Sequence, residues 1–153
     1  MKYLFILLAG FCVMSIKPTH AIHSIQFPSV TSENLNGRTF ELPQDFQGEL
    51  NLVIIAFQRR QQALVDTWLP LGRELKKQNP LFQYYELPTI SRLNPLSRWF
   101  INQGMRGGIP DSTARAVTIT LYLNKEEFKQ ALNIDSEDSI TVLLVNAEGF
   151  VKW

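Results

Sequence analysis

The sequence contains very little cysteine and very little histidine. Cys12 is the only cysteine among 153 residues, and His20 and His23 are the only histidines. One thiol cannot form a disulfide within the chain, so packing alone has to stabilise the fold. Zinc sites built from several cysteines or histidines are excluded for the same reason. We therefore expect neither a metal site nor a bound cofactor.

An excess of charge of one sign is also missing. The chain has 15 lysine and arginine residues against 14 aspartate and glutamate residues. Without surplus cations, it does not resemble the polybasic proteins that bind nucleic acid through its phosphates. Apolar residues make up 45% of the sequence, which excludes a disordered chain. The length is sufficient for one domain with a real core.

The N-terminus predicts an export signal. Lys2 precedes an apolar stretch at residues 3–16, and residues 19–21 (Thr-His-Ala) resemble the cleavage site of a secretory signal peptide. The stretch is shorter than the roughly 18–20 residues that span a bilayer, which argues against a membrane anchor. Residues 1–21 are thus predicted to be a signal peptide. Residues 22–153 are predicted to be one exported domain, periplasmic or secreted, with no membrane span and no cysteine.

Hydrophobic patterns predict alternating strands and helices. Strands are predicted at residues 38–42, 50–57, 81–87, 116–123 and 139–145. Helices are predicted at residues 61–78, 90–105 and 125–132, with a loop at Gly104, Gly107 and Gly108. A turn at residues 147–149 predicts a closing hairpin. This order favours α/β layers around a mixed sheet.

The first predicted helix has one apolar face. Leu64, Trp68, Leu71 and Leu75 follow the spacing of a single helix face, which we expect to pack on the sheet. Pro70 lies inside this pattern and is expected to kink the helix without ending it. Trp68 and Trp153 are both predicted to be core residues.

Several of these segments resemble the thioredoxin-like, or redoxin, superfamily. Residues 27–57 are similar to its lead-in and first buried strand, a helix with an internal proline follows, and residues 140–153 are similar to its terminal hairpin. The resemblance implies a mixed β-sheet flanked by helices and ending in a β-hairpin. In that superfamily the catalytic cysteines follow the buried strand, where this chain has Gln58-Arg59-Arg60-Gln61. The proline that precedes the penultimate strand is also missing from residues 138–141.

A narrower resemblance covers Tyr84 to Trp153. This part is similar to the mitochondrial ATP synthase assembly factor family often numbered ten, and to its bacterial relatives. The shared residues are the Tyr-Glu-Leu-Pro of 85–88, Trp99, Arg106, Ile109-Pro110, Tyr122, Ala-Leu-Asn-Ile at 131–134, and Trp153. The resemblance implies a helper in membrane-complex assembly and not an enzyme. The expected partner is another protein, such as a membrane-complex subunit.

Five residues are candidates for binding. Arg59 and Arg60 follow the buried strand and begin a helix, where an anion would meet both cations and free backbone N–H groups. The alternative is a solvated pair bonded to nearby carboxylates. Arg98, Trp99 and Arg106 form a mixed basic and apolar segment, which either packs on the sheet, as we favour, or docks on a partner or a membrane surface.

These observations leave two functional hypotheses. The first is an exported, redox-inactive thioredoxin-like domain that binds another protein or helps to assemble a membrane complex. The second is a thiol-free enzyme, or an anion-binding protein, that uses Arg59 and Arg60. No catalytic residue can be named for either. Asp66 and Glu86 could form a carboxylate pair, but nothing in the sequence places them together.

Overall fold

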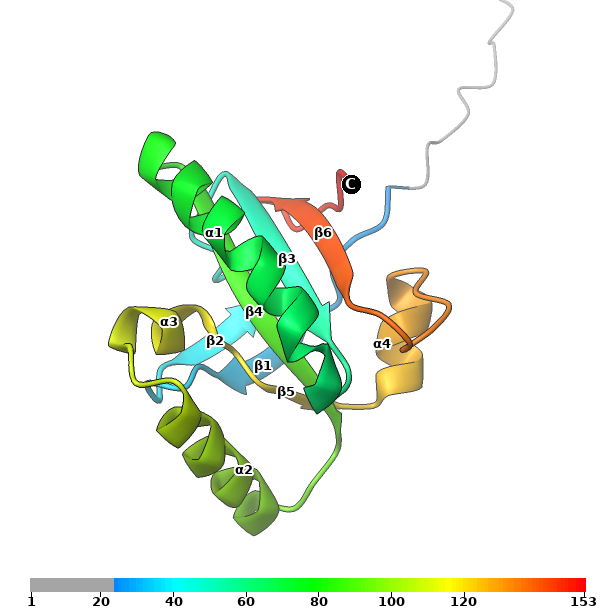
Figure 1. Cartoon of the computed structure of the whole chain (residues 1–153). Helices are drawn as coiled ribbons and strands as arrows, with labels where there is room; N and C mark the ends of the chain where they lie inside the picture. Colours follow the sequence, from blue (N-terminus) through cyan, green and yellow to red (C-terminus); the bar gives the residue numbers. More distant parts are fainter. Residues whose placement is uncertain (1–23) are drawn as a thin grey trace, which may run out of the picture.

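The computed structural model describes residues 24–153, and Figure 1 shows their arrangement. The predicted signal peptide lies outside these residues. Four strands form the central sheet, in the order β5-β4-β3-β6. They are β3 (Leu50–Ala56), β4 (Phe82–Ser91), β5 (Leu121–Leu123) and β6 (Thr141–Asn146). Strand β4 is parallel to both β3 and β5, and β6 is antiparallel to β3. The mixed sheet predicted from the sequence is therefore confirmed.

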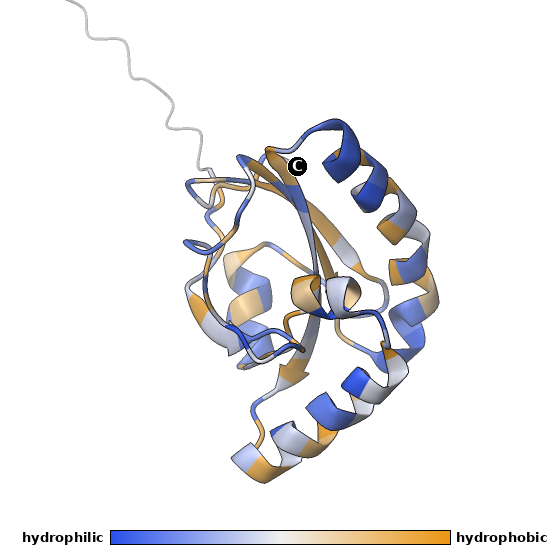
Figure 2. Cartoon of the chain, turned by 90° about the vertical axis from the view of Figure 1, so that its left-hand side faces the viewer, coloured by the Kyte–Doolittle hydropathy of each residue, from blue (hydrophilic) through white to orange (hydrophobic). Residues whose placement is uncertain are grey.

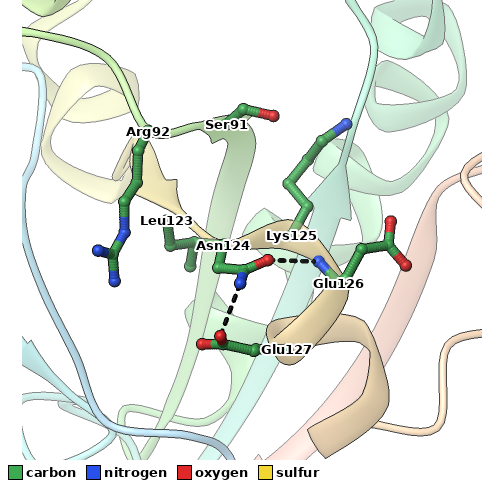
Figure 3. A pocket seen from close by; sticks show the side chains of 7 residues that line it. All are labelled: Ser91, Arg92, Leu123, Asn124, Lys125, Glu126 and Glu127. Atoms are coloured by element: carbon green, nitrogen blue, oxygen red, sulfur yellow. Dashed lines mark hydrogen bonds between the residues drawn. The ribbon is translucent and has the colours of Figure 1, made fainter.

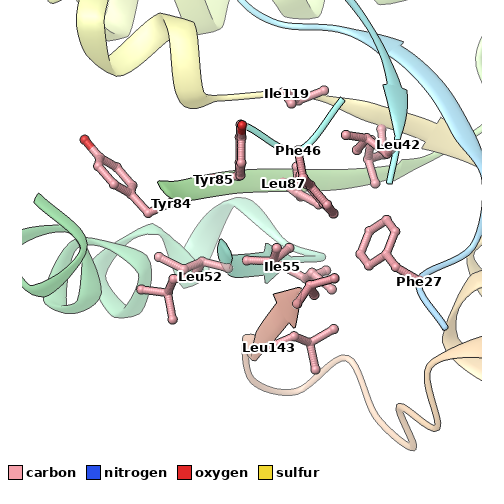
Figure 4. Packing of buried hydrophobic residues seen from close by; sticks show 14 of the residues in the cluster. Phe27, Leu42, Phe46, Leu52, Ile55, Tyr84, Tyr85, Leu87, Ile119 and Leu143 are labelled. Carbon is pink, nitrogen blue, oxygen red and sulfur yellow. The ribbon is translucent and has the colours of Figure 1, made fainter. Parts of the chain in front are cut away.

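The sheet is covered on both faces, which explains why β3 is apolar along its whole length. Helix α1 (Gln62–Gln78) lies across one face, and the antiparallel pair β1 (Val30–Glu33) and β2 (Thr39–Leu42) lies on the other. Aromatic rings fill the second face, where Phe27, Phe46 and Tyr85 pack together (Figure 4).

The apolar face predicted for α1 is wrong in its orientation. Leu64 and Leu71 are each nearly half exposed, whereas Val65 and Gly72 are buried. A Cβ at position 72 would lie 2.9 Å from the ring of Tyr84, so glycine allows the helix to approach the sheet closely. The helix continues through Pro70, as predicted. Trp68 is half-buried, but its neighbour Trp153 is mainly exposed, which contradicts the core prediction for Trp153.

Strand β4 is longer than predicted, and helix α2 (Pro95–Gly108) starts later. Pro88 does not end β4 because it pairs with Ala56, the last residue of β3. Pro95 is the first residue of α2 and does not interrupt it, and Asn94 caps the helix by accepting a hydrogen bond from the Ser97 backbone. Gly104, Gly107 and Gly108, which were predicted to form a loop, lie in the last turns of this helix.

The segment predicted as a strand at residues 116–123 divides in two. Its beginning belongs to helix α3 (Ser112–Val117), which Asp111 caps by accepting hydrogen bonds from the Thr113 and Ala114 backbone. Only its end forms β5. The cap signal of an aspartate before Ser112 explains this outcome, because it outweighs the alternating pattern that follows.

The C-terminal elements agree with the prediction. Asn124 caps helix α4 (Lys125–Ala131) through the Glu126 backbone N–H. Strand β6 then turns at Gly149, whose φ of 84° is in the left-handed region. The last residues return along β6, since the Phe150 carbonyl accepts a hydrogen bond from the Asn146 backbone and Lys152 donates one to Leu144. This is the closing hairpin.

Candidate functional site

The turn that follows β3 is closed by one buried side chain. Gln61 is 2% exposed, and its Oε1 accepts hydrogen bonds from the backbone N–H groups of Phe57 and Gln58, at 2.8 and 3.1 Å. Its Nε2 donates to the Glu137 carbonyl at 2.7 Å, and Gln58 Nε2 donates to the same oxygen. Gln58 and Gln61 are three residues apart, and their side chains join the turn after β3 to the loop before β6. Neither of the two hollows described below is lined by a residue of this corner.

Arg59 and Arg60 are exposed on the outside of this corner, in the short 3-10 helix η1 (Arg59–Gln61) that leads into α1. Arg60 Nε donates to Gln58 Oε1 at 2.6 Å. Neither arginine forms an ion pair with any carboxylate in residues 24–153. The pair is thus solvated, as the alternative expected, but it is bonded to no carboxylate in the described part of the chain, and the anion-binding role stays a prediction.

The other parallel strands end near a shallow hollow of about 440 Å³ (Figure 3). Its polar groups are largely occupied with one another. Asn124 Nδ2 donates to Glu127 Oε1 at 2.6 Å, and Lys125 forms an ion pair with Glu137. Hydrogen bonds from Lys125 and Lys129 hold the pKa of Glu137 below its usual value. Apart from Arg92, the charged groups of the hollow are already paired or hydrogen-bonded, so few of them remain for a ligand.

A second groove, of about 490 Å³, brings three of the five predicted residues together. It lies between α2 and the β1–β2 pair, and Tyr122 of β5 also contributes to it. Its lining residues are Thr31, Ser32, Glu33, Thr39, Pro95, Arg98, Trp99, Asn102, Gln103, Arg106 and Tyr122. Two cations and one carboxylate thus face this space. Arg59 and Arg60 do not line it.

The two arginines of this groove are held in place by backbone carbonyls. Arg98 Nε donates to the Leu93 carbonyl at 2.8 Å, and its guanidinium lies 5.2 Å from the centre of the Tyr122 ring. Arg106 Nε donates to the Leu35 carbonyl. The Nη groups of both arginines donate to no residue in the described chain. They are therefore oriented donors without an acceptor, which suits a carboxylate.

Polar side chains between the arginines fix the position of α2. The Tyr122 hydroxyl donates to Asn102 Oδ1 at 2.8 Å. Burial raises the pKa of Tyr122, and the positive charge of Arg98 partly opposes this. The hydroxyl therefore stays protonated at neutral pH. No sequence pattern indicates that Tyr122 and Asn102 meet, because β5 and α2 are joined through an intervening helix.

Helix α2 does not pack its aromatic residues on the sheet, so the interpretation favoured from the sequence is wrong. None of its residues is buried. Trp99 is 53% exposed and Phe100 61% exposed, and their rings meet edge to face at 4.9 Å between centres. The physical reason is that polar contacts of Arg98, Asn102 and Arg106 occupy the side of the helix that faces the fold.

A buried carboxylate lies beneath the start of α1. Glu86 of β4 is 4% exposed, and burial raises its pKa above 4.5, with the charge of Asp66 adding to the shift. The polar side chains of Gln62 and Thr118 partly oppose this rise in pKa. Gln62 Nε2 also donates to Asp66 at 3.0 Å. The structure thus brings Asp66 and Glu86 near each other, and Gln62 lies between them. Neither of the two hollows described above is lined by Asp66 or Glu86.

No protein-family model matches the sequence, and no curated protein is similar to it. Solved structures share its fold. A thiol-disulfide oxidoreductase from Bacteroides fragilis is 14% identical with a TM-score of 0.54, over 84% of this chain and 88% of that chain. The exposed lipoprotein thioredoxin of Streptococcus pneumoniae is 16% identical with a TM-score of 0.52, over 82% and 87%.

A third structure is that of BsSco, a member of the Sco family of cytochrome c oxidase assembly proteins. It is 16% identical to this chain with a TM-score of 0.52, over 84% of this chain and 81% of BsSco. Identities this low establish the arrangement of strands and helices and nothing finer. This chain therefore has the thioredoxin-like fold.

Proposed function

We propose that this protein is an exported, redox-inactive thioredoxin-like domain that binds an acidic segment of another protein. The observation that carries the proposal is the groove beside α2, where Arg98 and Arg106 are oriented by backbone carbonyls and keep free Nη donors. A role in assembling a membrane complex is the form of this function that the resemblance to the assembly factor family favours. The assembly role of BsSco, which has the same fold, is consistent with it.

The corner after β3 supports the redox-inactive part of the proposal. The resemblance to the superfamily puts Gln58 to Gln61 where cysteines would be expected, and Gln61 satisfies two backbone N–H groups at once. A side chain that is buried and fully hydrogen-bonded has a structural role, since its removal would leave those groups unpaired. The same corner that carries a thiol in oxidoreductases of this superfamily is here a structural joint.

The groove supports the choice of an acidic partner. Arg98 and Arg106 are eight residues apart on one helix, which places them about 12 Å apart along its axis. An extended peptide rises about 3.3 Å per residue, so two carboxylates three or four residues apart would reach both arginines. Trp99 offers an apolar ring between them. Bidentate pairing with guanidinium groups gives such a site specificity as well as affinity.

Photo-crosslinking tests this function. A photoreactive residue at Gln103, which lines the groove, is expected to give a discrete cross-linked partner in the intact cell envelope. Arg98→Gln with Arg106→Gln should lower its yield at least about tenfold, because both charge-assisted contacts are lost. The matched control is Arg59→Gln with Arg60→Gln, which removes two equally unpaired cations elsewhere. Thermal melts of both variants establish that they are folded.

The control also tests the second hypothesis. Arg59 and Arg60 are exposed and have no carboxylate partner in the described residues, which is the observation that favours an anion site there. Loss of binding only in the Arg59 and Arg60 variant would favour the anion-binding or thiol-free enzyme alternative. A yield that neither variant changes would contradict both.

The chain is expected not to reduce insulin disulfides and not to consume peroxide with a thiol donor. Cys12 is its only thiol and lies in the predicted signal peptide. Wild-type protein and Cys12→Ser should therefore be equally inactive, while a dithiol thioredoxin assayed in parallel is active. Turnover by the wild type that Cys12→Ser abolishes would refute the redox-inactive assignment.

A further inference from the structure

We propose that the outer face of α2 docks on an anionic lipid surface. This face meets the groove at Trp99, but the interaction does not depend on the protein partner proposed for the groove. The occupant is the headgroup region of a bilayer that contains anionic lipid. The observations behind the proposal are an exposed apolar ridge on α2, a stretch of chain with cations and no carboxylate, and the outlying position of this helix.

The ridge consists of Leu96, Trp99 and Phe100, which are 65%, 53% and 61% exposed. Positions 96, 99 and 100 are neighbours on a helix surface, so the three side chains form one patch. Exposed apolar side chains that gather in this way mark interaction sites in soluble proteins. Trp99 also lines the groove, so the ridge adjoins the polar side of α2, whereas Leu96 and Phe100 do not line the groove.

Charge complementarity selects the occupant. Residues 87–110 contain no aspartate or glutamate, while they include Arg92, Arg98 and Arg106. Among the residues that line the groove, the one carboxylate is Glu33, which belongs to β1 on the side opposite α2. Arginines beside exposed tryptophan, phenylalanine and leucine are the composition of helices that lie in the headgroup layer of a membrane. Each cation near an anionic surface adds to the attraction.

The shape of α2 favours a flat surface over a concave protein pocket. The helix lies at the lower margin of the molecule in both views, outside the sheet and its covering layers (Figures 1 and 2). Beyond the ridge, Gly104, Gly107 and Gly108 have no atoms within 4 Å of a Cβ built on them. No bulky side chain at these positions would hold a planar surface away from the ridge. The tryptophan ring, with an apolar body and a polar N–H, is suited to the boundary between water and lipid.

Vesicle binding tests the proposal. The protein is expected to bind vesicles of phosphatidylglycerol and phosphatidylcholine at least about tenfold more tightly than vesicles of phosphatidylcholine alone. Leu96→Ser with Phe100→Ser should weaken binding to the anionic vesicles at least about tenfold. The matched control, Leu64→Ser with Leu71→Ser, removes two leucines of α1 that are also nearly half exposed and should leave binding unchanged. All variants are produced with the same N-terminus, which mass spectrometry determines.

Brominated phosphatidylcholine in the anionic vesicles reports which tryptophan meets the lipid. Its quenching of tryptophan fluorescence is expected to be lost in Trp99→Phe and kept in Trp153→Phe, so the contact is assigned to α2 even if residues 1–21 also touch the membrane. Equal quenching in both variants, or equal affinity of the ridge variant and the wild type, overturns the proposal. Failure to bind vesicles overturns it too. None of these outcomes bears on the cross-linked protein partner, which Arg98 and Arg106 test separately.

Discussion

Replacing Gln61 with alanine is expected to destabilise the folded chain by about 3–5 kcal/mol, because two backbone N–H groups lose their acceptor and one carbonyl keeps only one of its two donors. The N–H groups are those of Phe57 and Gln58, and the carbonyl is that of Glu137. These contacts join the end of β3, the start of α1 and the loop before β6. Urea unfolding followed by circular dichroism measures the change.

The control for this substitution is Gln78→Ala. Gln78 is exposed at the end of α1 and its side chain bonds only Glu74, so its loss should change stability by no more than about 0.5 kcal/mol. If Gln61→Ala were as mild as Gln78→Ala, water would be replacing the lost contacts, and the corner would be open to solvent. The interpretation of a closed structural joint would then be wrong.

Replacing Glu86 with glutamine is expected to stabilise the protein at neutral pH by about 1–3 kcal/mol, because it removes a buried charge that is incompletely compensated. The folded-state pKa of Glu86 is raised above 4.5, mainly by burial. A carboxyl group with a raised pKa contributes its full stability below the unfolded-state pKa. That contribution is lost as the pH rises through the higher folded-state pKa.

The pH dependence therefore identifies the cause. Wild type and Glu86→Gln should be equally stable below about pH 4, and the variant should gain its advantage as the pH rises to neutrality. Denaturant melts at several pH values measure the difference. Asp66→Asn, which alters only the exposed neighbour, should shift the wild-type curve slightly in the same direction. A variant less stable than the wild type at neutral pH would mean that ionised Glu86 makes stabilising contacts.

The fold could be predicted where hydrophobic pattern and turn chemistry agree. The apolar run of β3, the cap at Asn124 and the turn at Gly149 each give a local signal that long-range packing does not override. The face of α1 could not be predicted, since Gly72 is a core residue without an apolar side chain. At Pro88, the outcome depended on where the neighbouring strand ends, which only the sheet register defines.

Only part of the candidate groove could be predicted from the sequence. Arg98 and Trp99 lie in one predicted helix and Arg106 follows its predicted end, so the sequence grouped them only as neighbours on one segment. Tyr122 and the residues of β1 come from distant parts of the chain, and only the tertiary structure brings them to α2. The exposure of Trp99 could not be predicted either, because the pattern of α2 suits burial equally well. What decides it is a set of polar anchors with no sequence signature.

Those anchors also determine how the molecule opens. Helix α2 has no buried residue, and a few polar contacts, chiefly those of Arg98, Asn102 and Arg106, tie it to the fold. Detaching it exposes little apolar surface, whereas separating β3 from β4 requires the whole core to come apart. Amide protons of α2 should therefore exchange with solvent through local unfolding of this helix, while those of the sheet should exchange only through global unfolding. The proposed binding surface thus belongs to the part of the protein that can rearrange at the lowest cost to the rest.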